Sequence, residues 1–150
     1  MVWSCLVSIL PGMAQTEKLT DYVNPFVGTD GYGNVYPGAQ IPFGGIQISP
    51  DTDSRFYDAA SGYKYNHLTL MGFSLTHLSG TGIPDLGDFL FIPGTGEMKL
   101  EPGTHEDPDQ GYRSRYSHDK EWASPNYYAV ELADYGVKAE MTSGVRSGMF

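Results

Sequence analysis

The chain has 150 residues, a formal net charge of −9 and a sequence pI near 4.6. The length is typical of one domain, and the acidic balance argues against nucleic acid as a partner because a phosphate backbone would be repelled. The single cysteine, Cys5, excludes an internal disulfide and a cysteine-rich zinc site, and no apolar stretch approaches the ~20 residues of a membrane span.

The first 14 residues are predicted to be a signal peptide, shortened at its start. Val2 to Met13 is apolar apart from two serines and a proline, and Gly12-Met13-Ala14 fits the small-x-small pattern of a cleavage site. No Lys or Arg precedes this stretch, so a disordered N-terminal tail is the alternative. The signal peptide predicts a periplasmic or secreted protein whose domain covers residues 15–150.

Short apolar or alternating runs separated by turn residues predict an all-β chain. Ile46 and Ile48 alternate with polar neighbours before Pro50 ends the run, and residues 68–75 form a continuous apolar stretch typical of a buried strand. The strands predicted before residue 120 cover 46–49, 68–75, 88–92, 97–100 and 111–118. Apolar spacing at three and four residues is nowhere sustained, so we expect helices only as short turns.

The clearest predicted hairpin lies near the C-terminus. Its first strand alternates over 126–132, Asp134-Tyr135-Gly136 turns the chain, and its second strand runs from Val137 to Met141. Residues 145–150 have the pattern of a further strand that is just starting, so we expect the polypeptide to continue. The whole pattern predicts an antiparallel β-sandwich with long loops.

The loop 76–82, with the sequence Thr-His-Leu-Ser-Gly-Thr-Gly, is a candidate binding loop. Gly80 and Gly82 allow backbone N–H groups to approach a ligand, while His77 and Ser79 could hydrogen-bond to it. The alternative is a tight turn in which His77 only packs against a neighbour. The loop is not a nucleophile elbow, because Gly-x-Ser-x-Gly is absent.

Other glycine-rich and acidic segments do not have the spacing of known ligand motifs. Residues 28–33 have the wrong glycine spacing for a phosphate loop. The segment from Asp30 to Asn34 lacks the ligand spacing of an EF-hand, so we interpret both residues, with Asp51 and Asp53, as turn residues that accept local backbone hydrogen bonds.

Residues 55–65 combine aromatic side chains with Asp58 and Ser61. Aromatic faces stack on the C–H faces of sugar rings while carboxylates bind sugar hydroxyls, but such clusters also fill protein cores. Both interpretations of this segment stay open, and no pair of catalytic carboxylates can be located.

Several of these segments, in this order, resemble glycoside hydrolase family 92. The resemblance covers 19–150 and rests on Tyr22–Asn34, Tyr36-Pro-Gly-Ala, Pro42-Phe-Gly, Gln47–Thr52, Ser61-Gly-Tyr, Gly72-Phe-Ser, Thr76–Gly82 and Gly87-Asp88. It implies a secreted or periplasmic exo-α-mannosidase in which an N-terminal β-sandwich precedes a helical (α/α)6-type catalytic domain. It also implies inversion of the anomeric configuration with the help of calcium.

In that family the catalytic carboxylates and the calcium ligands come mainly from the helical domain. The resemblance therefore implies that this chain is the N-terminal part of the enzyme, inactive alone, with its own C-terminal helical domain and a mannose-containing glycan as partners. The alternatives are a stand-alone carbohydrate-binding β-sandwich without catalysis and a gene remnant. The residues it implies as substrate contacts are Tyr57, Asp58, His77, Ser79 and Asn34.

Tyr57 occupies the position at which many α-1,2-specific members carry Trp. This departure leaves α-1,3, α-1,4 or another mannosidic linkage open.

Overall fold

The computed structural model describes residues 17–53, 57–85 and 87–150, so the predicted signal peptide over 1–14 lies outside the described residues. The described part is all-β with antiparallel pairing, as the sequence predicts. Its helical elements are single 3-10 turns: η1 (Leu19–Tyr22), η2 (Tyr57–Ala59), η3 (Pro108–Gln110) and η4 (His118–Lys120). In the same residues, no helix has the length and apolar character that crossing a membrane requires.

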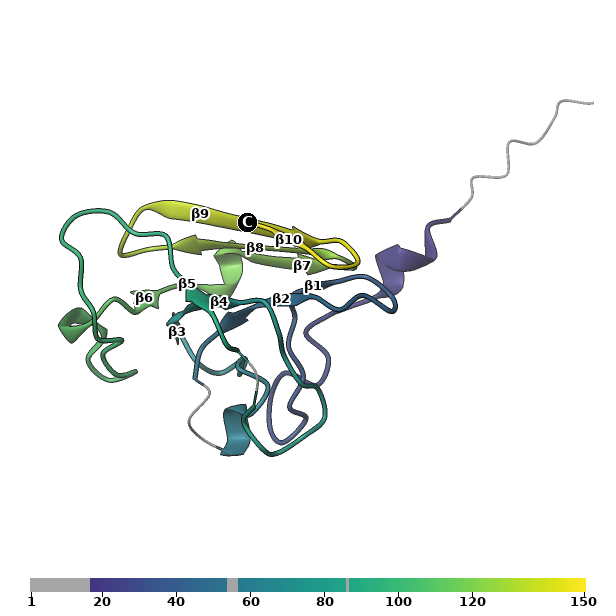
Figure 1. The fold of residues 1–150 in the computed structure, drawn as a ribbon, viewed down its shortest axis with the longest axis horizontal. Helices are drawn as coiled ribbons and strands as arrows, with labels where there is room; N and C mark the ends of the chain where they lie inside the picture. Colours follow the sequence, from purple (N-terminus) through teal and green to yellow (C-terminus); the bar gives the residue numbers. More distant parts are fainter. Residues whose placement is uncertain (1–16, 54–56, 86) are drawn as a thin grey trace, which may run out of the picture.

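Two four-stranded sheets lie one above the other (Figure 1). The first has the order β1 (Ala39–Gln40), β2 (Gln47–Asp51), β4 (Gly72–Ser74) and β5 (Leu90–Phe91). The second has the order β10 (Gly148–Met149), β9 (Val137–Ser143), β8 (Tyr127–Leu132) and β7 (Glu121–Ser124). A small third sheet pairs β3 (Thr69–Leu70) with β6 (Ser114–Arg115).

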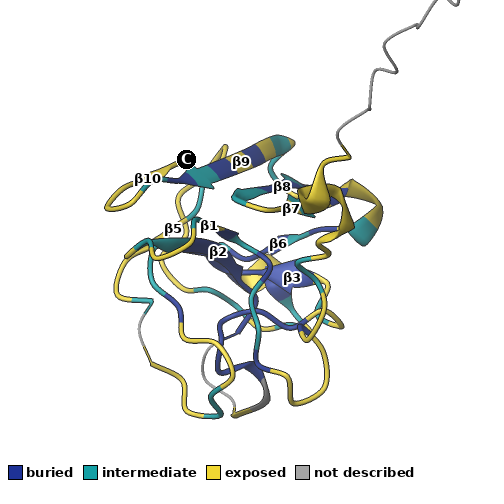
Figure 2. Ribbon diagram, turned by 90° about the vertical axis from the view of Figure 1, so that its right-hand side faces the viewer, coloured by how far each residue is buried: buried dark blue, intermediate teal, exposed yellow. Residues whose placement is uncertain are grey.

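The core lies between the two large sheets. In β8 every second side chain points inward, so Tyr128, Val130 and Leu132 are fully buried. They belong to one apolar cluster with Ile48 and Phe73 of the first sheet. Figure 2 shows the resulting alternation of buried and exposed residues along β9. The predicted hairpin is confirmed, because β8 and β9 pair antiparallel from Tyr128 opposite Met141 to Leu132 opposite Val137.

The first sheet differs from the sequence prediction in detail. The apolar run 68–75 is split between β3 and β4, which belong to different sheets. The break occurs where the Met71 N–H donates to the Asp51 carbonyl at 2.7 Å and Gly72 adopts φ +155°. β2 continues through Pro50 to Asp51, and the predicted strand 88–92 contains only the short, exposed β5. The described residues 97–100 form no strand.

Long loops gather on the side of the first sheet that faces away from the second sheet, in the lower half of Figure 1. Backbone hydrogen bonds connect loops that are distant in sequence: the Gly80 N–H donates to the Asn34 carbonyl at 2.7 Å, and the Tyr65 N–H donates to the Thr29 carbonyl at 2.9 Å. Because these loops hold one another, they can maintain a defined site without regular secondary structure.

Candidate functional site

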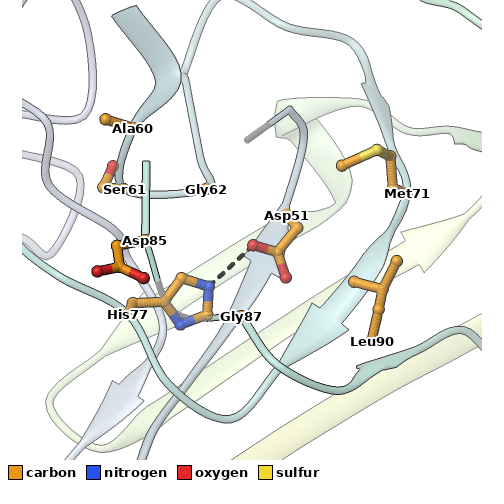
Figure 3. Close-up of a pocket in the computed structure, with 9 residues that line it drawn as sticks. All are labelled: Asp51, Ala60, Ser61, Gly62, Met71, His77, Asp85, Gly87 and Leu90. Atoms are coloured by element: carbon orange, nitrogen blue, oxygen red, sulfur yellow. Dashed lines mark hydrogen bonds and ion pairs between the residues drawn. The ribbon is translucent and has the colours of Figure 1, made fainter. Parts of the chain in front are cut away.

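A small pocket opens among these loops, next to the end of β2 (Figure 3). Its volume is about 80 Å³, which is enough for a few water-sized groups and too little for a whole sugar ring. A ligand would therefore place one polar substituent in it. The pocket is lined by Asp51, Ala60, Ser61, Gly62, Met71, His77, Asp85, Gly87 and Leu90.

The lining residues come from separate sequence motifs that the fold brings to one place. Asp51 ends β2, Ser61 and Gly62 follow η2, His77 follows β4, and Gly87 lies before β5. These five residues all belong to the short sequence motifs on which the family resemblance rests. Segments that look unrelated along the chain thus form a single site.

His77 lines the pocket and is buried. Its Nε2 lies 3.0 Å from Oδ1 of Asp51, and its Nδ1 lies 2.7 Å from the carbonyl oxygen of Gln47. The hydroxyl of Ser74 donates to the second carboxylate oxygen of Asp51 at 2.6 Å. Burial opposes the charged imidazole, but the Asp51 carboxylate and these hydrogen bonds outweigh it and raise the pKa of His77 above its usual value.

Gly62 has to be glycine because its backbone lies directly against this pair. Its φ is +88°, and a Cβ added to it would lie 2.2 Å from Oδ1 of Asp51 and 3.0 Å from Cδ2 of His77. The carbonyl oxygen of Gly62 accepts the N–H of Thr52 at 2.6 Å. The Asp51–His77 pair and the segment after η2 are therefore in direct contact.

The other predicted contact residues lie around the same loops. Tyr57 is 66% exposed, and its ring lies against Gly82. A Cβ added to Gly82 would lie 2.3 Å from Cζ of Tyr57. Asn34 is buried, and its Oδ1 has no hydrogen-bond partner among the residues that the structure describes. Ser79 is exposed on the loop that contains His77. Asp58 belongs to η2, but its side chain lies outside the described residues.

Asp51 is the residue that the sequence analysis misinterpreted. As a turn residue it would accept local backbone hydrogen bonds, but its oxygens accept from Ser74 and contact His77 across the pocket. The turn interpretation is correct for Asp30, whose Oδ1 accepts the Gly31 N–H at 2.7 Å. Asp53 is buried, and its carboxylate lies 3.5 Å from Nε2 of His105.

The sequence feature that could have identified Asp51 is its position at the end of a run of alternating apolar and polar residues. A residue at the end of a strand lies next to the loops that follow the sheet. Ser61 and Asp85 also line the pocket and were not predicted as site residues. Ser61 belongs to the Ser61-Gly-Tyr motif of the resemblance, whereas nothing in the local sequence distinguishes Asp85 from an ordinary loop residue.

A buried carboxylate in the second sheet fixes the segment after η2. Glu121 accepts from the Tyr63 hydroxyl at 3.0 Å and from Tyr128, and its Oε2 lies 2.6 Å from Nδ1 of His118. Burial is the main cause that raises the pKa of Tyr63, and the neighbouring Tyr116 and Glu121 raise it further. The Tyr63 hydroxyl therefore stays protonated and can donate a hydrogen bond. Tyr63 directly follows the pocket residues Ser61 and Gly62, so the second sheet supports the pocket from behind.

Residues 22–150 match the model of the glycosyl hydrolase family 92 N-terminal domain. A β-sandwich whose loops bring that domain's motifs together at one pocket is thus the N-terminal module of a glycoside hydrolase. The chain belongs to glycoside hydrolase family 92, which confirms the resemblance inferred from its motifs.

Known proteins similar to this chain are much longer than it is. An "uncharacterized secreted glycosidase" of Arthroderma benhamiae is 32% identical over 123 residues, which cover 81% of this chain and 15% of that protein. The solved structure of the family 92 glycosyl hydrolase ccman5 superposes with a TM-score of 0.69 at 33% identity, over 86% of this chain and 18% of that one.

The family 92 inverting mannosidase BT2199 of Bacteroides thetaiotaomicron superposes with a TM-score of 0.59 at 23% identity. That match covers 89% of this chain and 18% of the mannosidase, and it supports the fold alone.

Proposed function

We propose that this chain is the N-terminal, substrate-contacting part of a secreted exo-α-mannosidase that inverts the anomeric configuration. Membership of family 92 supports a glycoside hydrolase. BT2199, which shares the fold, is described as an inverting mannosidase, and the proposed substrate class and stereochemistry are taken from that description. The secreted glycosidase of Arthroderma benhamiae supports export.

The observation that carries the proposal is that the family motifs meet at one small pocket, on loops that also expose the aromatic ring of Tyr57. The pocket presents the Ser61 hydroxyl and the Asp85 carboxylate, both suited to sugar hydroxyls. Tyr57, against Gly82, offers an exposed ring on which a sugar could stack. A mannose residue would place one hydroxyl-bearing substituent in the pocket, with Tyr57, Asp58, His77, Ser79 and Asn34 as the proposed contact residues.

Catalysis is assigned to a helical segment outside this chain. Inversion needs a general acid and a general base about 6.5–9.5 Å apart on opposite faces of the sugar. Asp51 is already engaged by Ser74 and His77, so it serves the pocket rather than the reaction. The calcium ion is assigned to the same helical segment. Within 17–53, 57–85 and 87–150, no three carboxylate, imidazole or thiol groups are grouped as metal ligands.

The rival function is a stand-alone carbohydrate-binding module, and one pair of measurements separates it from the proposal. The 150-residue chain is titrated with α-1,2-, α-1,3- and α-1,4-mannobiose by NMR, and the product of the full reading frame is assayed for mannose release with and without a chelator. We expect amide shifts near Gly62 and Gly82 in the chain, no hydrolysis by the chain alone, and chelator-sensitive release by the longer product. Hydrolysis by the chain alone, or a reading frame without a helical catalytic segment, would contradict the proposal.

A further inference from the structure

The hydrogen-bond geometry around His77 specifies its protonation state. Nδ1 faces the carbonyl oxygen of Gln47, which can only accept, so Nδ1 carries a hydrogen. Nε2 faces a carboxylate oxygen of Asp51, which also only accepts when it is ionised. The Ser74 hydroxyl has a single hydrogen, and its shorter contact, 2.6 Å, is to Asp51 rather than the 3.0 Å contact to Nε2. When Asp51 is ionised, both ring nitrogens are therefore donors and His77 is an imidazolium.

The surroundings of His77 support that positive charge. The ring of Tyr36 lies 5.1 Å from the imidazole, within the range of a cation–π contact. Burial raises the pKa of Tyr36 to about 12, so this ring stays neutral. Among the residues that the structure describes, the side chains that face His77 are Asp51 from β2, Ser74 from β4, Tyr36 from the loop before β1 and Asp85, which lines the same pocket. The charged members of this set are both acidic.

We propose that Asp51 is a positioning residue that keeps His77 doubly protonated, and that this buried ion pair holds the segment Ala60–Gly62 in the shape that receives the sugar. The sugar-receiving role rests on the proposed function, whereas the ion pair and its contact with Gly62 do not. When Nε2 loses its proton, its lone pair faces Oδ1 of Asp51 at 3.0 Å, and the two repel each other. Asp51 cannot turn away freely, because Gly62 leaves no space beside that oxygen.

The direct test is an NMR titration of the ring nitrogens of His77 and the amide of Gly62 in the whole 150-residue chain. We expect both ring nitrogens to be protonated at pH 7, the imidazole to titrate above the ordinary value of ~6.5, and the Gly62 amide to shift at the same midpoint. One protonated nitrogen at pH 7, or a Gly62 amide that does not follow His77, would overturn the proposal.

Two variants separate the charge of Asp51 from the hydrogen bond it accepts. In Asp51→Asn the carboxylate is lost at nearly constant size, so burial is opposed mainly by the hydrogen bond to the Gln47 carbonyl, and the His77 midpoint should fall below ~6.5. In Ser74→Ala the carboxylate remains, so the midpoint should stay above ~6.5. An unchanged midpoint in Asp51→Asn overturns the assignment. Should that variant fail to fold, the wild-type and Ser74→Ala titrations still decide the protonation state and its coupling to Gly62.

The affinity for the mannobioses, measured below and above the His77 midpoint, separates this proposal from the proposed function. We expect affinity to fall at least about tenfold across the midpoint, which corresponds to about 1.4 kcal/mol. Equal affinity on both sides overturns the positioning role while the proposed function stands. Coupled titration of His77 and Gly62 with no mannobiose binding at any pH supports the positioning of the segment and contradicts the proposed function instead.

Discussion

The β8–β9 hairpin and the loops around the pocket are stabilised in different ways. The hairpin has long paired strands, and most of its inward side chains are apolar and buried. Around the pocket the strands are short, and the buried groups include Asp51, Ser74 and His77. Buried polar groups are stable only when each is hydrogen-bonded. The hairpin therefore depends on a repeated pattern, and the pocket depends on individual residues.

This difference predicts where the largest losses of stability arise. Leu132→Ala removes a fully buried side chain of β8, so it should lower the free energy of unfolding by about 2–5 kcal/mol. The measurement is urea unfolding followed by circular dichroism. Leu100→Ala is the matched control, because Leu100 is 81% exposed, and it should change stability by less than about 0.5 kcal/mol. Equal losses in the two variants would contradict the assigned core.

Gly62→Ala tests the close approach at the pocket. A positive φ costs an alanine about 1–2 kcal/mol, and the crowding against Asp51 should bring the total loss to about 2–4 kcal/mol. Gly80→Ala is the control: φ there is +74° and nothing lies within 4 Å of the added Cβ, so only the conformational cost applies. Urea unfolding of both variants gives the difference. Similar losses would show that the segment after η2 relaxes away from Asp51.

The hairpin could be predicted from sequence because its information is local. Alternation over Tyr128, Val130 and Leu132, followed by a turn with Gly136 in the positive-φ region, is sufficient to define both strands and their register. The run 68–75 was predicted as one strand because its apolar pattern does not show that Met71 donates to Asp51, a residue from another strand.

The site was predictable only in part, for the same reason. The motif around His77 identified a loop that lines the pocket, but the partner of His77 is Asp51, 26 positions earlier. That pairing depends on the antiparallel register of β2 and β4, in which Ser49 lies opposite Ser74. A residue whose role is defined by such a contact looks, in the sequence, like any other aspartate beside a turn.

The pocket should respond to pH in a way that the hairpin does not. The raised pKa of His77 means that its ion pair contributes stability fully below the unfolded value of ~6.5, and that this contribution is lost as pH rises through the folded pKa. For one proton the slope is at most about 1.4 kcal/mol per pH unit. Urea unfolding at several pH values above 6.5 should show this decline in the wild type and not in Asp51→Asn. The same slope in both would assign it to other groups.

The smallest effect on stability and a clear effect on binding are expected at Tyr57. Its ring is mostly exposed against Gly82, so Tyr57→Ala should change the free energy of unfolding by less than about 0.5 kcal/mol. If the ring stacks on the sugar, the same variant should weaken mannobiose binding about 3- to 10-fold, the equivalent of one aromatic contact. Isothermal titration calorimetry measures this change.

Phe43→Ala is the control for that experiment, because Phe43 is fully exposed on the loop between β1 and β2 and does not line the pocket. Loss of affinity in Phe43→Ala but not in Tyr57→Ala would move the sugar site away from the pocket. Tyr57→Trp restores a larger ring at the same position, and it should retain binding while changing the preference among the α-1,2-, α-1,3- and α-1,4-linked disaccharides. An unchanged preference would mean that the ring at position 57 supports the sugar without selecting its linkage.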